Sequence, residues 1–350
     1  MSNHFESQDG WTRFQPTDKS VGGILYSPCQ SDGLPLIVAL HGCSQTAADF
    51  ALGTKLTDVA SREGVAILFP ESQRTQDTIA LNPFGCWVWW AEENQGAKGE
   101  AQKIMALVDR ARTQNPAISQ EPFCVTGLSS GAAMAVILAV SYTDQVAALA
   151  SHAGVAFAAA ELETPTPPQK AQTPSDAFSV AKQFSPLNIL QLHQWVSKST
   201  DTLERAPTVK DALGAIDVSS VPAKGISIPP ALIVYGRGDA QVDPDHSRRL
   251  AVQLLQIAGY QSDKLFTDDL EALATEHDKT CGGQGNYNIK ISEFRDAKAD
   301  SCVRLVAISE LGHAWSGGSA GGSYTDPLGP DATQMTWEFF KQVVPHLRGH

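Results

Sequence analysis

The sequence Gly-Leu-Ser-Ser-Gly at residues 127–131 places a serine between two glycines, where two apolar segments meet. Residues 122–127 are typical of a buried strand, and residues 129–144 are typical of an apolar helix. A serine on such a sharp turn holds its hydroxyl above the sheet, and the helix N-terminus favours developing negative charge there. The pattern predicts a nucleophile at Ser129; a purely structural turn is the alternative.

A serine hydroxyl becomes a good nucleophile only when a base accepts its proton and an acid orients that base. Where strands alternate with helices, the acid follows a later strand and the histidine comes last. Asp239 follows the strand expected at 230–236, and His313 follows the last apolar strand in a glycine-rich loop. We therefore predict the catalytic set Ser129, Asp239 and His313.

Other side chains compete for two of these roles. Asp243 and Asp245 lie further along the chain, where the next helix is expected to begin, so an N-cap and a first-turn acid explain them better. His152 also ends a strand and is the main rival of His313 for the base. His41, in a His-Gly pair, is expected to form structural hydrogen bonds.

Acyl transfer also needs hydrogen-bond donors for an oxyanion. One donor is expected to be the backbone N–H of Ser130, directly after the candidate nucleophile, and the other the backbone N–H of Cys43, in the loop after the strand at 35–42. Substitution cannot remove a backbone donor, so the position of this donor depends on the rigidity of the loop. A disulfide between Cys43 and Cys86 is one hypothesis for holding it.

The cysteines and the N-terminus indicate different compartments. An even number of cysteines, six, suits an oxidising compartment, whereas the chain as written starts without an apolar signal segment and so predicts a cytoplasmic protein. A secreted or periplasmic mature form is the alternative. Cys281 and Cys302 flank an expected hairpin and are disulfide candidates, while Cys124 is expected to be a buried apolar residue. The chain lacks a Cys-x-x-C motif, so zinc has little support and no metal site is predicted.

Apolar strands that alternate with helices must position these side chains. This order predicts an α/β fold with a mostly parallel sheet flanked by helices. Segments at 11–16 and 22–28 are expected to add antiparallel strands, and a helix is expected over 44–64. Residues 160–229, rich in Pro, Thr, Ser and Gln, predict a lid-like insertion. We expect a single domain over residues 1–350.

The overall charge of the chain limits the kinds of molecule that it is expected to bind. A net charge of −12 disfavours nucleic acid and anionic membranes, because the chain has too few cations to displace their counterions. The sequence contains no run of 18 apolar residues, so no membrane span is predicted. A neutral small-molecule or polymer substrate suits this balance better, and the oligomeric state cannot be predicted.

Four segments of the chain resemble the catalytic domain of the polyhydroxybutyrate depolymerase family, which also includes feruloyl and acetyl esterases. In chain order they read LIVALHGCSQTAADF, GCWVWWAEENQGAKGEAQKI, VTGLSSGAAMAVILA and GHAWSGGSAGGSYTDPLGPDATQMTWEFF. The resemblance implies an α/β-hydrolase fold without a cofactor. It also implies that the serine, aspartate and histidine of the family fall on Ser129, Asp239 and His313, and its second oxyanion donor on Cys43.

The same resemblance suggests where a substrate would bind. The aromatic pair of the family falls on Trp87 and Trp89, which would line an ester-binding cleft; a buried aromatic cluster is the alternative. Trp315 is expected near the site because it lies two residues after His313. The chain has Ser130 where the family often has alanine, and it shows no separate polymer-binding domain.

The leading functional hypothesis is a serine esterase that hydrolyses short-chain 3-hydroxyalkanoate polyester, or its oligomers, through an acyl-enzyme. A carboxylesterase for feruloyl, acetyl or other small esters is the alternative. A remote alternative is a non-catalytic adhesion protein that presents the Arg-Gly-Asp tripeptide at 237–239. Burial of Asp239 would exclude that use, since a receptor can read only an exposed side chain.

Overall fold

The computed structural model describes residues 10–28, 32–73, 82, 84–89, 91, 94, 96–157, 228–258, 270, 276–282, 287–295 and 302–348. The insertion predicted at 160–229 lies almost wholly outside these residues, so its role as a lid stays a prediction. The same holds for the expectation of a single domain over the whole chain.

The core of the fold is one mixed sheet. Its strands are β1 (Trp11–Phe14), β2 (Gly22–Tyr26), β3 (Leu36–Leu40), β4 (Ala66–Glu71), β5 (Phe123–Leu128), β6 (Val146–His152), β7 (Ala231–Gly236), β8 (Glu276–Gly282), β9 (Tyr287–Arg295) and β10 (Cys302–Ile308). They lie in the order β1-β2-β4-β3-β5-β6-β7-β10-β9-β8. The strands from β4 to β10 in this order pair in parallel, and antiparallel strands extend both edges.

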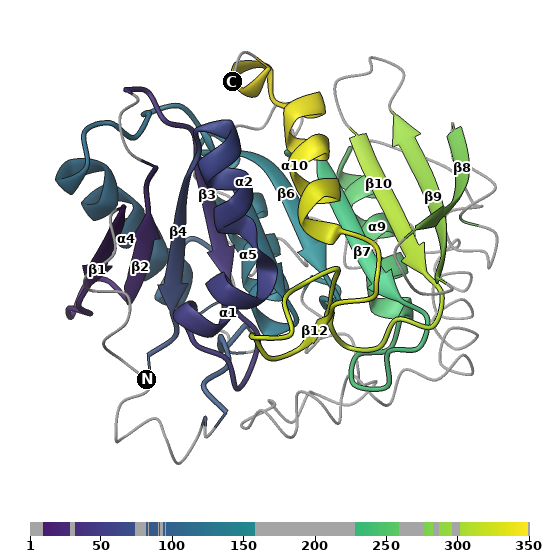
Figure 1. Ribbon diagram of the computed structural model, residues 1–350. Helices are drawn as coiled ribbons and strands as arrows, with labels where there is room; N and C mark the ends of the chain where they lie inside the picture. The colour runs from purple at the N-terminus through teal and green to yellow at the C-terminus, as the bar shows by residue number, and fades with distance from the viewer. Residues whose placement is uncertain are drawn as a thin grey trace, which may run out of the picture.

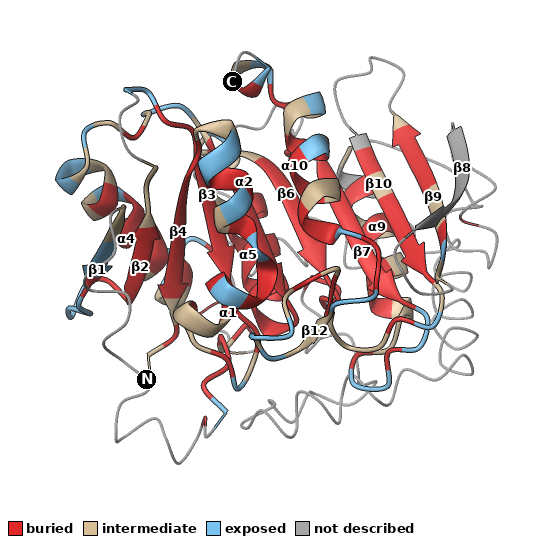
Figure 2. Ribbon diagram, viewed as in Figure 1, coloured by how far each residue is buried: buried red, intermediate tan, exposed pale blue. Residues whose placement is uncertain are grey.

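Helices cover both faces of the sheet, as Figure 1 shows. They are α1 (Ala47–Thr54), α2 (Leu56–Glu63), α4 (Gly99–Gln114), α5 (Ser130–Ser141), α9 (Asp245–Ile257), α10 (Ala332–Val343) and the short 3-10 helix η6 (Pro345–Leu347). One hydrophobic core lies between the sheet and α4, α5 and α9, and a second lies between the sheet and α1, α2 and α10. The central strands are buried along their length (Figure 2), because both of their faces are covered.

The predicted fold class is therefore confirmed: a mostly parallel sheet lies between two layers of helices. The antiparallel pairing of β1 with β2 is also as expected. Within the described residues no helix is long and apolar enough to span a bilayer.

The helix expected over 44–64 is interrupted. It forms two helices, α1 and α2, because Lys55 adopts a left-handed backbone conformation with φ of 56°. The carbonyls that end α1 accept hydrogen bonds from the C-terminal part of the chain: the backbone N–H of Ser319 donates to Gly53, and the hydroxyl of Thr333 donates to Thr54. A tertiary contact thus replaces the helical hydrogen bonds that local propensity favours.

The two disulfide candidates Cys281 and Cys302 do not pair with each other, because β9 lies between their strands. The register places Cys281 beside Asn288 and Cys302 beside Arg295, near opposite ends of β9. At a rise of ~3.4 Å per residue, the two cysteines lie on the order of 20 Å apart along the sheet. A disulfide needs a Cα–Cα distance below ~7 Å.

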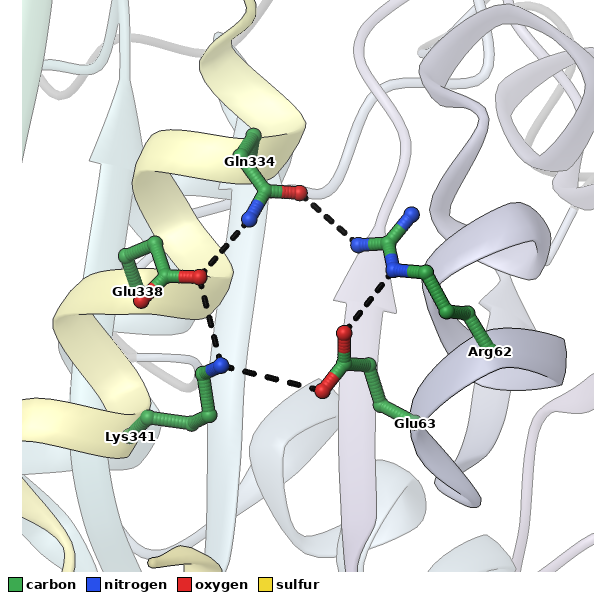
Figure 3. Close-up of polar contacts among 5 residues, drawn as sticks. All are labelled: Arg62, Glu63, Gln334, Glu338 and Lys341. Carbon is green, nitrogen blue, oxygen red and sulfur yellow. Dashed lines mark hydrogen bonds and ion pairs between the residues drawn. The ribbon is translucent and has the colours of Figure 1, made fainter. Parts of the chain in front are cut away.

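A ring of polar contacts joins α2 to α10 at the surface (Figure 3). Arg62 donates to Gln334 and pairs with Glu63, and Lys341 pairs with both Glu63 and Glu338. The hydrogen bond from Arg62 holds the pKa of Glu63 below its ordinary value. Arg62 and Glu338 are about half exposed, so solvent screens the ring and each pair contributes ~1 kcal/mol or less.

Apolar packing rather than this ring should therefore hold α10 in place. We expect Phe340→Ala, at a side chain that is fully buried against the sheet, to lower the free energy of unfolding by about 3–5 kcal/mol. Glu63→Gln should lower it by less than ~1 kcal/mol. Urea unfolding of both variants checks this, and an equal loss in the two would contradict it.

Candidate active site

Ser129 lies on a strained turn between β5 and α5. Its backbone has φ of 57° and ψ of −120°, a conformation that costs a non-glycine residue free energy and recurs at functional sites. A side chain at Gly127 would collide with the carbonyl of Gly131, and one at Gly131 would collide with the carbonyl oxygens of Leu40 and His41. The two glycines thus allow the turn, and the N-terminus of α5 lies directly behind Ser129.

His313 and Asp239 meet as the sequence predicts. Nδ1 of His313 lies 2.7 Å from Oδ2 of Asp239, and both side chains are nearly fully buried. The other carboxylate oxygen of Asp239 accepts the backbone N–H groups of Gln241 and Val242, at 2.8 and 3.0 Å. The carboxylate is therefore fixed in orientation, and its hydrogen bond with Nδ1 leaves Nε2 of His313 for the pocket.

The loops that carry the acid and the histidine support each other. Gly238, in the loop after β7, donates its N–H to the carbonyl of Leu311, in the loop after β10, at 3.0 Å. A side chain at Gly236 would collide with the same carbonyl. Because β5, β7 and β10 run parallel, all three loops leave the same edge of the sheet, which places the three predicted residues together.

The loop predicted to supply an oxyanion donor, residues 41–45 and called the oxyanion loop below, follows β3 and lies against Ser129. His41 is buried: its Nε2 accepts the backbone N–H of Ser72 at 3.1 Å, so its Nδ1 carries the proton and donates to the carbonyl of Gly42 at 2.8 Å. The Cys43 N–H points away from that carbonyl, since the two groups are trans across one peptide bond. Within the described residues, no hydrogen bond occupies the backbone N–H of Cys43 or Ser130.

A disulfide holds the oxyanion loop, as the sequence suggested. Cys43 and Cys86 are bonded, and the backbone N–H of Ser44 donates to the carbonyl of Phe84 at 2.6 Å. The side chain of Asn82 in turn bonds both backbone groups of Cys86. The loop that contains Phe84 and Cys86 is therefore a rigid support for the predicted oxyanion donor at Cys43.

These elements enclose a pocket of about 180 Å³. Its lining residues are Gly42, Cys43, Ser44, Gln45, Phe84, Leu128, Ser129, Gln241, His313 and Tyr324. Sequence reasoning missed the two aromatic residues. Tyr324 stands edge-on to His313 with ring centroids 6.2 Å apart and has a positive φ of 51°, while Phe84 is half exposed. In the sequence, only its position could have identified Tyr324 as a pocket residue, because it lies in the glycine-rich loop that follows His313.

The predicted cleft tryptophans do not line this pocket. Trp87 and Trp315 are fully buried and Trp89 is 7% exposed, and all three belong to the hydrophobic cores. Trp87 lies against His41 and Trp315 against His152, with ring centroids 5.4 and 4.0 Å apart. The alternative of burial therefore describes Trp87 and Trp89, while Trp315 lies in the second core, on the other face of the sheet.

The competing residues take structural positions. His152 is buried below the site, where its Nε2 lies 3.0 Å from Oγ1 of Thr336. Its burial lowers the pKa of the imidazole to about 3. Asp245 lies in the first turn of α9, and its backbone N–H bonds the side chain of Asp243. The side chain of Asp239 is buried, so the Arg-Gly-Asp tripeptide does not present the exposed aspartate that adhesion would need.

We expect loss of the disulfide to destabilise the protein strongly. The bridge closes a loop of 43 residues, so the chain-entropy relation gives about 4 kcal/mol for the double variant Cys43→Ala/Cys86→Ala. Cys124→Ala is the matched control, because this buried cysteine is free and should cost only ~1 kcal/mol. Urea unfolding measures both; equal losses would show that the bridge adds nothing.

Burial of His152 should make stability depend on pH. Its pKa lies below that of the unfolded chain, near 6.5, so the unfolded state binds the extra proton between these values. The contribution is complete above pH ~6.5 and falls by up to ~1.4 kcal/mol per pH unit as the pH drops toward 3. In His152→Gln this slope should shrink by about that amount, as urea unfolding at pH 6.5, 5.5 and 4.5 would measure. Identical slopes would contradict the prediction.

Comparison with known proteins shows that part of the chain is similar to a family of esterases. Residues 23–165 match the family described as Esterase PHB depolymerase. The chain is 30% identical over 165 residues to feruloyl esterase B of Thermothelomyces thermophilus, covering 45% of this chain and 54% of that protein. It is 33% identical over 121 residues to poly(3-hydroxyalkanoate) depolymerase C of Paucimonas lemoignei, covering 34% and 28%. The match thus spans about half, or less, of the length of these relatives.

A solved structure extends the likeness beyond the matched segment. The acetyl xylan esterase from Aspergillus awamori superposes with a TM-score of 0.60 at 17% identity, over 87% of this chain and 93% of that one. At this identity the likeness shows the fold alone. The chain thus has the α/β fold of this esterase, and its residues 23–165 match the family described as Esterase PHB depolymerase.

Proposed function

We propose that this chain is a serine esterase in which Ser129 attacks the ester, His313 is the base and Asp239 orients the histidine. The observation that carries the proposal is the 2.7 Å contact between His313 and Asp239, at a pocket whose wall also includes Ser129. The esterases among the relatives support the same reaction type. Within the described residues no second histidine lines this pocket.

In the proposed reaction, Nε2 of His313 accepts the proton of the Ser129 hydroxyl as the oxygen attacks the ester carbonyl. The backbone N–H groups of Cys43 and Ser130 stabilise the oxyanion, with help from the N-terminus of α5. His313 then protonates the departing alcohol, and the acyl group stays on Ser129. Water repeats the sequence and releases the acid.

The pocket favours a neutral ester with a short acyl group. Among its described lining residues there is no lysine, arginine, aspartate or glutamate, so an internal ester of an uncharged chain suits it. Its volume of about 180 Å³ is below the roughly 300–1,000 Å³ of pockets that enclose drug-sized ligands. Phe84 and Leu128 offer apolar surface, where each buried CH₂ contributes ~0.8 kcal/mol.

We infer that short-chain 3-hydroxyalkanoate polyester, or its oligomers, is the substrate. The relation to the depolymerase of Paucimonas lemoignei and the apolar pocket support this choice. Feruloyl or acetyl esters are the second candidate, because feruloyl esterase B and acetylxylan esterase A of Emericella nidulans match at similar identity. The Cys43–Cys86 disulfide supports folding in an oxidising compartment, outside the cytosol.

The test compares initial rates on amorphous polyhydroxybutyrate granules, a feruloyl ester and an acetyl ester. We expect granule clearing to exceed turnover of the feruloyl ester, and Ser129→Ala to lower kcat by roughly 10⁴- to 10⁶-fold. Ser61→Ala, at an exposed serine of α2, is the matched control and should keep the wild-type rate.

Each outcome decides a different part of the proposal. Feruloyl or acetyl turnover without granule clearing would overturn the polyester substrate and keep the serine esterase. Ester turnover that survives in folded Ser129→Ala would overturn the nucleophile itself. Near-UV circular dichroism of the variant checks that its tertiary packing is unchanged.

A further inference from the structure

Gln45 joins the oxyanion loop to the segment that follows His313. Its Oε1 accepts the backbone N–H of Gly42 at 2.8 Å, and its Nε2 donates to the carbonyl of Ser323 at 2.9 Å. The same Nε2 lies 3.2 Å from Oδ2 of Asp49. Gln45 is 2% exposed, and its hydrogen bond with Gly42 is buried.

Ser323 is held from a second side as well. Asp49, on α1, accepts the backbone N–H of Ser323 at 3.0 Å and also its hydroxyl. The next residue is Tyr324, which lines the pocket and stands edge-on to His313. Contacts from Gln45 and Asp49 therefore fix the backbone that presents Tyr324 to the imidazole.

The contact at Gly42 lies directly beside the candidate nucleophile. A Cβ at Gly42 would lie 3.4 Å from the Cβ of Ser129 and 3.1 Å from Oε1 of Gln45. Gln45 fixes the peptide before Gly42, while His41 fixes the peptide after it, which carries the N–H of Cys43. The direction of the proposed oxyanion donor therefore depends on both side chains.

We propose that Gln45 is a positioning residue that sets the place of the oxyanion loop relative to His313. This inference rests on the proposed esterase function. An amide suits the role because one end accepts and the other donates. A shift of the loop weakens the oxyanion donor, and since the oxyanion forms only as the reaction proceeds, the loss falls on kcat rather than on KM.

The first test is Gln45→Ala on 4-nitrophenyl butyrate. We expect kcat to fall about 10- to 100-fold with KM changed less than about threefold. Asp49→Ala, which frees Ser323 from the other side, should lower kcat in the same way, and the double variant should lose less than the product of the two effects. Unchanged kcat in folded Gln45→Ala would overturn the proposal.

The second test is Gln45→Glu, which changes the donor end alone. An ionised carboxylate still accepts from Gly42 but cannot donate to Ser323, and it faces the acidic side chain of Asp49. Protonation restores a donor. The rate of this variant relative to wild type should therefore rise several-fold between pH 8 and pH 5, whereas the relative rate of Gln45→Ala should stay flat.

Two controls separate the claims. Gln102→Glu, on an exposed position of α4, makes the same chemical change away from the site and should keep a constant relative rate. A relative rate of Gln45→Glu that does not change with pH would overturn the role of the donor end. If the wild type shows no ester turnover that depends on Ser129, the proposed function itself is overturned, whatever the rates of the Gln45 variants.

Discussion

The close approach of the N-terminus of α5 to the end of β3 is the constraint on which the site depends. Gly131 packs against the backbone carbonyls of Leu40 and His41 with no room for a side chain. This contact places Ser129 beside Gly42 and brings the helix N-terminus next to the oxyanion loop. The strained backbone at Ser129 follows from the same contact, because the chain must turn within a few residues.

The surroundings keep this strained turn in place. The backbone N–H of Ser129 donates to the carbonyl of His152, whose ring packs against Trp315 in the core. The disulfide at Cys43 stiffens the opposite wall, and polar contacts at His41 and Gln45 orient the peptides between them. Buried aromatic packing and local hydrogen bonds thus both support the pocket. The surface ring of α2 and α10 adds little stability.

Local patterns predicted the parts of the fold that depend on local chemistry. The alternation of apolar strands with helices predicted the sheet correctly. The turn glycines and the order of the strands predicted the catalytic set, of which Asp239 and His313 lie in contact. Such patterns could not predict contacts between segments that lie far apart in the chain. The break at Lys55 depends on Ser319 and Thr333, and the pocket position of Tyr324 depends on Asp49. The tryptophans show the same limit, since residue type alone does not decide between a core and a cleft.

The contact between Gln45 and Ser323 also has a consequence for the order of folding. The two residues are 278 positions apart in the chain, so the oxyanion loop gains this support only after Ser323 has been synthesised. Contacts of such long range slow folding, because the chain must close a large loop before they form. The oxyanion loop therefore stays without this support until the segment after His313 is present and docked against it.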